Sequence, residues 1–83
     1  MADIDVLLPQ SGMGMQDGEI LNWLKSVGDE VREGEFLVEV EAAKIVVEVP
    51  SPATGVLTEI FAQVGELIEV RAVIARVRET HTG

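Results

Sequence analysis

The side chain with the clearest chemical potential in this sequence is the amine of Lys44. It lies between two segments, 36–41 and 45–49, in which apolar and other residues alternate. Alternation with a period of two indicates strands that bury one face, so the segments predict a β-hairpin with Lys44 at its tip. We expect the turn from Ala42 to Ile45 to be type I, which most residues tolerate. Such a hairpin presents a primary amine to solvent for covalent attachment of an acyl group, or is simply a solvated lysine.

Other residue types that perform catalysis have no suitable neighbours in the sequence. Ser11, Ser26 and Ser51 have no histidine in the folded body to activate them, because His81 lies in the polar C-terminal segment. The stretch 12–14, Gly-Met-Gly, is too short to cradle a phosphate and precedes no predicted helix. The sequence has no cysteine, which excludes disulfides, thiolate metal sites and cysteine nucleophiles. We therefore expect a non-catalytic domain without a metal site.

Composition narrows the class of partner. The 83 residues suffice for one small domain with a modest core. Six basic and 15 acidic residues give a net charge of −9, which repels phosphate, so nucleic acid and anionic membranes are poor partners. No apolar run approaches the roughly 20 residues of a membrane span, and the start Met-Ala-Asp-Ile-Asp lacks the basic residues of a signal or transit peptide. We expect a cytoplasmic domain that is a monomer in isolation.

The two halves of the sequence resemble each other. An offset of 37 residues aligns Gly18 with Gly55 and Val27-Gly28 with Val64-Gly65. An offset of 41 aligns Leu8-Pro9 with Val49-Pro50, so the first loop is four residues longer than its counterpart. Strands are expected over 3–8, 18–24, 31–32, 36–41, 45–49, 55–61, 67–69 and 73–77. The repeat predicts an all-β fold: a flattened barrel or sandwich of two four-stranded antiparallel sheets with pseudo-two-fold symmetry.

The repeat also predicts where the hairpin lies. The Lys44 hairpin joins the halves, and its counterparts at the other pole are the termini, so the lysine and the chain ends should lie at opposite ends. We expect residues 1–78 to form the domain and 79–83 a flexible tail. The loop 10–17 should lie beside the hairpin. Gly18 and Gly55 are expected to supply positive φ or a close backbone approach, and Trp23 to pack against a sheet.

The residues around Lys44 resemble those of a known family. Residues 40–55 read V-E-A-A-K-I-V-V-E-V-P-S-P-A-T-G. They are similar to the lipoyl-lysine segment of 2-oxoacid dehydrogenase acyltransferases (E2 components), which typically reads V-E-T-D-K-A-x-V-E-V-P-S-P-x-x-G. Residues 8–18 resemble the first loop of the same family, and Trp23 and residues 27–31 follow at the expected places. The resemblance covers residues 4 to about 78, nearly the whole chain.

The resemblance implies the biotinyl/lipoyl carrier fold, with lipoic acid amide-linked to Lys44. Glu41, Ala42, Ala43 and Ile45 would form the attachment hairpin. In this family a lipoyl ligase or transferase attaches the arm, and a thiamine-diphosphate 2-oxoacid decarboxylase reductively acylates it. The acyltransferase core then passes the acyl group to coenzyme A, and dihydrolipoyl dehydrogenase reoxidises the arm. A further hypothesis assigns recognition by the decarboxylase to Met13, Gly14, Met15, Gln16 and Asp17, with a simple connection as the alternative.

The attachment segment departs from the family pattern at one position. Ala43 stands where lipoyl domains usually have aspartate, and biotin carriers typically read Ala-Met-Lys-Met at this point. Glu41, the segment Pro50-Ser51-Pro52 and the long first loop favour lipoic acid. Two alternatives remain open: a biotin carrier domain of a carboxylase and an unmodified adaptor domain.

Overall fold

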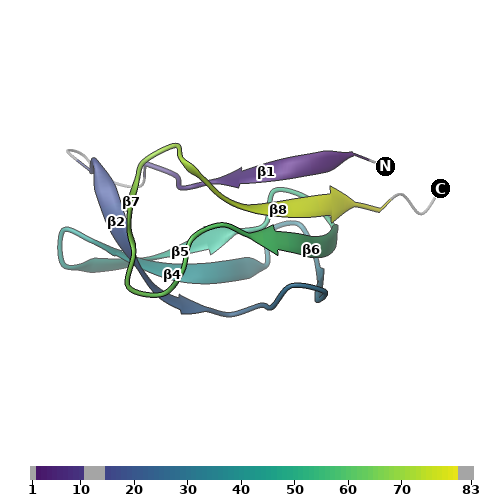
Figure 1. Ribbon diagram of the computed structural model, residues 1–83, viewed down its shortest axis with the longest axis horizontal. Helices are drawn as coiled ribbons and strands as arrows, with labels where there is room; N and C mark the ends of the chain where they lie inside the picture. Colours follow the sequence, from purple (N-terminus) through teal and green to yellow (C-terminus); the bar gives the residue numbers. More distant parts are fainter. Residues whose placement is uncertain (1, 11–14, 81–83) are drawn as a thin grey trace.

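The computed structural model describes residues 2–10 and 15–80 of the chain. These residues form only strands and connections, in the order β1 (Asp3–Leu7), β2 (Asp17–Trp23), β3 (Glu30–Val31), β4 (Phe36–Ala42), β5 (Ile45–Pro50), β6 (Gly55–Ile60), β7 (Leu67–Glu69) and β8 (Val73–Glu79). Figure 1 shows the strands in two packed layers. The prediction of an all-β fold is confirmed. No helix in the described ranges is long and apolar enough to cross a membrane.

The sheet topology reproduces the internal repeat. One four-stranded sheet has the order β1-β8-β6-β3 and the other has the order β5-β4-β2-β7, with all pairings antiparallel. The repeat aligns β1 with β5, β2 with β6, β3 with β7 and β4 with β8. Exchanging each strand for its counterpart converts the first order into the second, which confirms the predicted pseudo-two-fold symmetry. Each sheet therefore contains strands from both halves, and neither half forms a sheet alone.

The core lies between the sheets and follows the predicted alternation over most strands. Val6 and Leu8 of the first strand region are buried, as expected. Alternation over 36–41 and 73–77 assigns Phe36 and Val73 to the buried face, but these residues are 45% and 38% exposed, and their neighbours Leu37 and Ile74 are fully buried. The pairing register shifts at both places: Phe36 and Val38 of β4 pair with the consecutive residues Pro50 and Val49, and Val73 and Ala75 of β8 pair with the consecutive residues Leu7 and Val6. An extra residue at a bulge moves the following side chains to the opposite face, so the expected burial of Phe36 and Val73 is wrong.

Three other expectations concern single residues. Trp23 packs against the core, as predicted. Gly55 does not have positive φ, but a Cβ atom there would collide with the backbone carbonyl of Arg78, so its role is close approach. Glu79, expected in the tail, is the last residue of β8. The N–H of Thr80 donates to the carbonyl of Thr54 at 3.0 Å, which extends the ordered chain beyond the predicted boundary.

Candidate functional site

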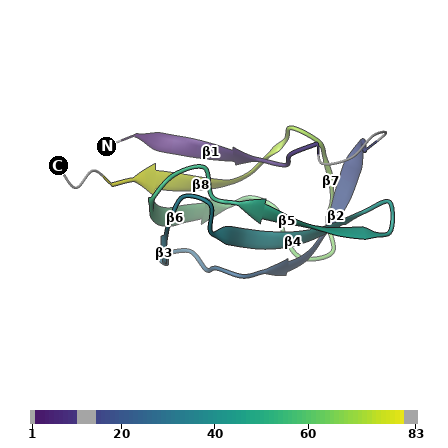
Figure 2. The same cartoon turned by 180° about the vertical axis from the view of Figure 1, so that it is seen from behind.

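Lys44 lies at the end of the molecule that is farthest from the chain termini. The hairpin formed by β4 and β5 projects from one end of the body, and both termini lie at the other (Figures 1 and 2). The body is elongated, with principal dimensions of 41 × 22 × 17 Å. This arrangement confirms the placement that the repeat predicted.

The tip is a tight two-residue turn. Ala42 pairs with Ile45, which leaves only Ala43 and Lys44 in the loop. Both have positive φ, 51° and 67°. Positive φ at both central residues defines a type I′ turn, so the prediction of type I is wrong. The physical reason is strand twist: in a two-residue loop, type I′ matches the right-handed twist of the strands, and type I would splay them apart.

The amine of Lys44 is available for modification. Lys44 is exposed, and no described residue forms a hydrogen bond or ion pair with its side chain. Ala42, directly before the turn, is 8% exposed and belongs to the core, so it anchors the hairpin to the body. The support is rigid, because β4 and β5 pair from Ala42–Ile45 back to Phe36–Pro50.

The strand after the lysine exposes apolar side chains. Ile45 and Val46 are 63% and 54% exposed. Alternation with Val47 and Val49 assigns Ile45 to the buried face, but it lies directly after the two-residue turn, at the projecting end of the hairpin, and is exposed. Sequence reasoning did not select Val46, although an apolar residue at an outward position of a strand was a usable signal. An enzyme that reaches the amine therefore meets an apolar surface beside it.

Acidic residues border the hairpin on the same sheet. Glu41 of β4 is exposed and lies opposite Val46 on β5 and opposite Glu19 on β2. Asp17, the first residue of β2, lies opposite Glu69 of β7. The lysine end of this sheet thus carries negative charge on three neighbouring strands.

The structure describes only part of the predicted recognition segment. Met13 and Gly14 lie outside the described residues. Met15 is 7% exposed and belongs to the core, whereas Gln16 and Asp17 are exposed. The carbonyl of Gln16 accepts a 3.0 Å hydrogen bond from the N–H of Val70, which fixes this end of the first loop against the connection between β7 and β8.

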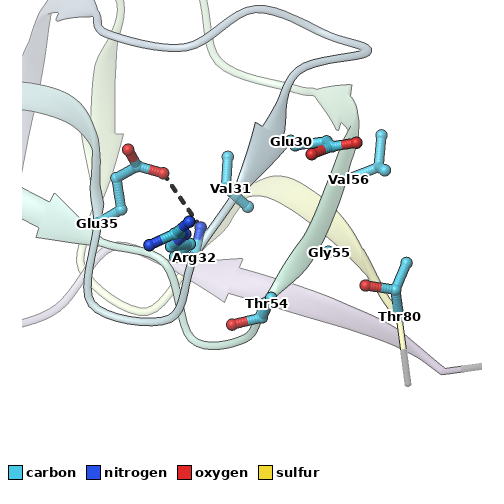
Figure 3. Close-up of a pocket in the computed structure, with 8 residues that line it drawn as sticks. All are labelled: Glu30, Val31, Arg32, Glu35, Thr54, Gly55, Val56 and Thr80. Atoms are coloured by element: carbon cyan, nitrogen blue, oxygen red, sulfur yellow. Dashed lines mark hydrogen bonds between the residues drawn. The ribbon is translucent and has the colours of Figure 1, made fainter. Parts of the chain in front are cut away.

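A hollow of about 680 Å³ lies at the end that carries the termini, away from Lys44. Figure 3 shows the residues that line it: Glu30, Val31, Arg32, Glu35, Thr54, Gly55, Val56 and Thr80. Glu35 accepts a 3.1 Å hydrogen bond from the backbone N–H of Arg32, and this bond, followed by the bond with Lys25, lowers the pKa of its carboxyl group. None of the lining residues belongs to the turn at Ala43 and Lys44, so the hollow is separate from the attachment hairpin.

The described residues contain no group of three or more His, Asp or Glu side chains that could hold a metal ion. They also contain no histidine that could act as a base toward a serine hydroxyl. What the hairpin end offers chemically is one accessible primary amine on a rigid support, flanked by apolar and acidic side chains.

Comparison with known proteins agrees with this geometry. The protein family described as "Biotin-requiring enzyme" matches residues 4–77. The chain is 41% identical over 80 residues to the dihydrolipoyllysine-residue acetyltransferase component of the pyruvate dehydrogenase complex of Corynebacterium glutamicum, covering 96% of this chain and 12% of that protein. It is 44% identical over 75 residues to the dihydrolipoyllysine-residue succinyltransferase component of the 2-oxoglutarate dehydrogenase complex of Staphylococcus saprophyticus, covering 90% of this chain and 18% of that protein.

A solved structure shows the same fold. The solution structure of the lipoyl domain of the 2-oxoglutarate dehydrogenase complex from Azotobacter vinelandii matches with a TM-score of 0.75 and 29% sequence identity. The match covers 94% of this chain and 99% of that domain. With its duplicated β body and its lysine at the hairpin tip, the chain belongs to the biotinyl/lipoyl carrier family.

Proposed function

We propose that this chain is a lipoyl carrier domain that is modified on Lys44 and serves a 2-oxoacid dehydrogenase complex. The observation that carries the proposal is the exposed amine of Lys44, which has no ion-pair partner among the described residues and lies on the two-residue turn at the end opposite the termini. The relatives named above support lipoic acid over biotin, because their names identify dihydrolipoyllysine components.

The hairpin fits a lipoyl group. The amine has no competing partner among the described residues, and Ala43, the other residue of the turn, has a side chain too small to obstruct it. When bound, a lipoyl group supplies acyl transfer and two-electron transfer through its dithiolane ring. The protein supplies position: the type I′ turn holds the lysine stem outside the body, and the stem adds reach. No residue of the domain performs catalysis in this scheme.

The modifying enzyme must provide what the domain lacks. A lysine amine in water is protonated near neutral pH, and attack on an activated acyl group requires the neutral form. No described carboxylate forms an ion pair with Lys44 or hydrogen-bonds to it. A lipoyl ligase or transferase therefore recognises the shape of the tip and removes the proton itself.

The further partners follow from the family. They are a thiamine-diphosphate 2-oxoacid decarboxylase, the acyltransferase core and dihydrolipoyl dehydrogenase. Among the described residues of the proposed recognition segment, Gln16 and Asp17 are exposed and can contact the decarboxylase, whereas the side chain of Met15 packs in the core.

Intact mass spectrometry tests the proposal. The domain is co-expressed with a lipoyl ligase in one culture and with a biotin ligase in another. We expect a lipoyl adduct in the first, and none in the matched Lys44→Arg variant, which keeps the charge but cannot accept the acyl group. A biotinyl adduct alone would show a biotin carrier, and no adduct with either enzyme would support an unmodified adaptor.

A further inference from the structure

Two turns that the internal repeat aligns have different residue types at their third position, which is Gly34 in the first half and Arg71 in the second. In the first half, the N–H of Glu35 donates to the carbonyl of Arg32 at 2.9 Å; in the second, the N–H of Ala72 donates to the carbonyl of Glu69 at 3.1 Å. The third residue of each turn has positive φ: 89° at Gly34 and 75° at Arg71. Positive φ at only the third position is typical of a type II turn, which favours glycine there.

The backbone role of Arg71 does not require its side chain. Its N–H donates a 2.8 Å hydrogen bond to the carbonyl of Leu8, and glycine would donate the same bond. The Cβ atom of an L-residue disfavours this left-handed conformation. Strain of this kind persists where the residue has another use, so the side chain requires an explanation beyond the turn.

The guanidinium of Arg71 has no partner within the described part of the chain. Three of the six basic residues form ion pairs: Lys25 with Glu35, Arg76 with Asp5 and Glu59, and Arg78 with Asp3. Arg71 is exposed and forms none, although Glu69 lies in the same turn. Its charge is therefore available to a group outside the domain.

Arg71 lies at the base of the first loop, in the half of the molecule that carries Lys44. Its turn holds both ends of that loop, through the bond from Arg71 to Leu8 and the bond from Val70 to Gln16. Figures 1 and 2 both place the connection between β7 and β8 in the half that contains the hairpin, away from the termini. Arg71 is thus a positive charge in an otherwise acidic region, close to Asp17 and Glu69 in the fold.

We propose that Arg71 is a docking residue whose guanidinium binds an aspartate or glutamate side chain on the 2-oxoacid decarboxylase that acts on the arm at Lys44. A guanidinium binds a carboxylate through two parallel hydrogen bonds, which fixes orientation as well as distance. One cation within an acidic surface sets the register of docking, because a partner shifted in position would meet like charge. This inference rests on the proposed carrier function.

Kinetics of reductive acylation test the inference. The lipoylated domain is given as substrate to bacterial pyruvate and 2-oxoglutarate decarboxylases, each with its 2-oxoacid, and compared with lipoylated Arg71→Gly, Arg71→Lys and Arg32→Ala. Arg32 is the matched control, since it is also exposed and without an ion pair but lines the hollow at the other end. Mass spectrometry first establishes equal lipoylation.

With the decarboxylase that acylates the wild type, we expect Arg71→Gly to lower kcat/KM about fivefold, with the loss shrinking at higher salt. The same variant should unfold at a higher denaturant concentration, because glycine relieves the strained turn. Arg71→Lys keeps the charge but loses the two parallel hydrogen bonds, so its kcat/KM should lie between those of Arg71→Gly and the wild type, and Arg32→Ala should leave kcat/KM unchanged. Unchanged kcat/KM in Arg71→Gly would overturn the docking role alone, whereas a wild-type domain that accepts no lipoyl group would remove the carrier function with it.

Discussion

The indole N–H of Trp23 donates a 2.9 Å hydrogen bond to the carbonyl of Ala62. The bond joins the end of β2, in the first half of the repeat, to the loop after β6, in the second. Ala62 is 1% exposed, so water has little access to its carbonyl. This side-chain hydrogen bond adds to the strand pairing and the core that already join the two halves.

Replacing Trp23 by phenylalanine tests this contact. The variant keeps an aromatic ring against the core but leaves the Ala62 carbonyl without its donor, which should lower the free energy of unfolding by about 1–3 kcal/mol. Urea denaturation followed by circular dichroism measures the change, because the variant lacks the tryptophan signal. Leu24→Ala, at a neighbouring side chain that is 41% exposed, should cost less. Equal losses in both variants would mean that the bond adds nothing.

Substitution of glycines should separate steric contact from conformational strain. Gly55→Ala places a methyl group into the backbone carbonyl of Arg78, which cannot move without opening the pairing of β6 with β8. We expect a loss of about 3 kcal/mol or more. Gly28→Ala meets no atom within 4 Å, but φ is +98°, so its cost should be only about 1 kcal/mol. Thermal unfolding ranks the two, and the reverse order would contradict the close approach at Gly55.

The type I′ turn makes Ala43 a target for stabilisation. Asparagine and aspartate tolerate positive φ better than alanine, so Ala43→Asn and Ala43→Asp should each stabilise the hairpin by about 0.5 kcal/mol. Ala43→Val is the matched control and should destabilise it, since a β-branched side chain disfavours that conformation. Hydrogen exchange of the β4 and β5 amides reports hairpin opening.

Ala43→Asp should also affect the lipoylation of Lys44. Because Ala43→Asp restores the residue that lipoyl domains usually carry, we expect a faster rate of lipoylation by a lipoyl ligase, measured by mass spectrometry over time. Ala43→Asn separates turn shape from charge. If Ala43→Asp is modified no faster than the original chain, the residue before the lysine does not limit recognition.

Glu35 should contribute to the dependence of stability on pH. Hydrogen bonds to its carboxylate from the backbone N–H of Arg32 and from Lys25 lower its pKa below the ordinary value of 4.5. A carboxyl group with a depressed folded-state pKa stabilises the fold above its unfolded pKa, and this contribution disappears as the pH falls through the folded value. The difference in unfolding free energy between the original chain and Glu35→Gln should therefore shrink below about pH 4.5. A difference that stays constant to lower pH would contradict the shift.

The sequence predicted the strands and their symmetry because both depend on local alternation and on a repeat that can be read directly. The positions of Gly18 and Gly55, and of the matched Val-Gly turns, were sufficient to place Lys44 opposite the termini. The position of Lys44 at the tip of a hairpin also followed from the sequence, since it needs only a lysine between two strands.

What the sequence did not predict depends on backbone geometry and on tertiary contacts. The bulge near Phe36 inserts one residue, so the neighbouring side chains point to the opposite face of the sheet. No residue preference in the sequence indicates a bulge at this position. The turn at Ala43 and Lys44 takes its handedness from strand twist, although neither residue type favours positive φ. Burial depends on what lies opposite: Met15 is covered by the core, while Ile45 extends beyond it.

The chain enters and leaves at one end of a body that is 41 Å long, and the amine lies at the other end. When a polypeptide anchors the domain by either terminus, the length of the body therefore adds to the distance that the amine can reach. The polypeptide joined to a terminus also lies far from an enzyme that binds around the hairpin tip. The domain can therefore be fused to an unrelated anchor by either terminus, and the amine should remain as accessible as before.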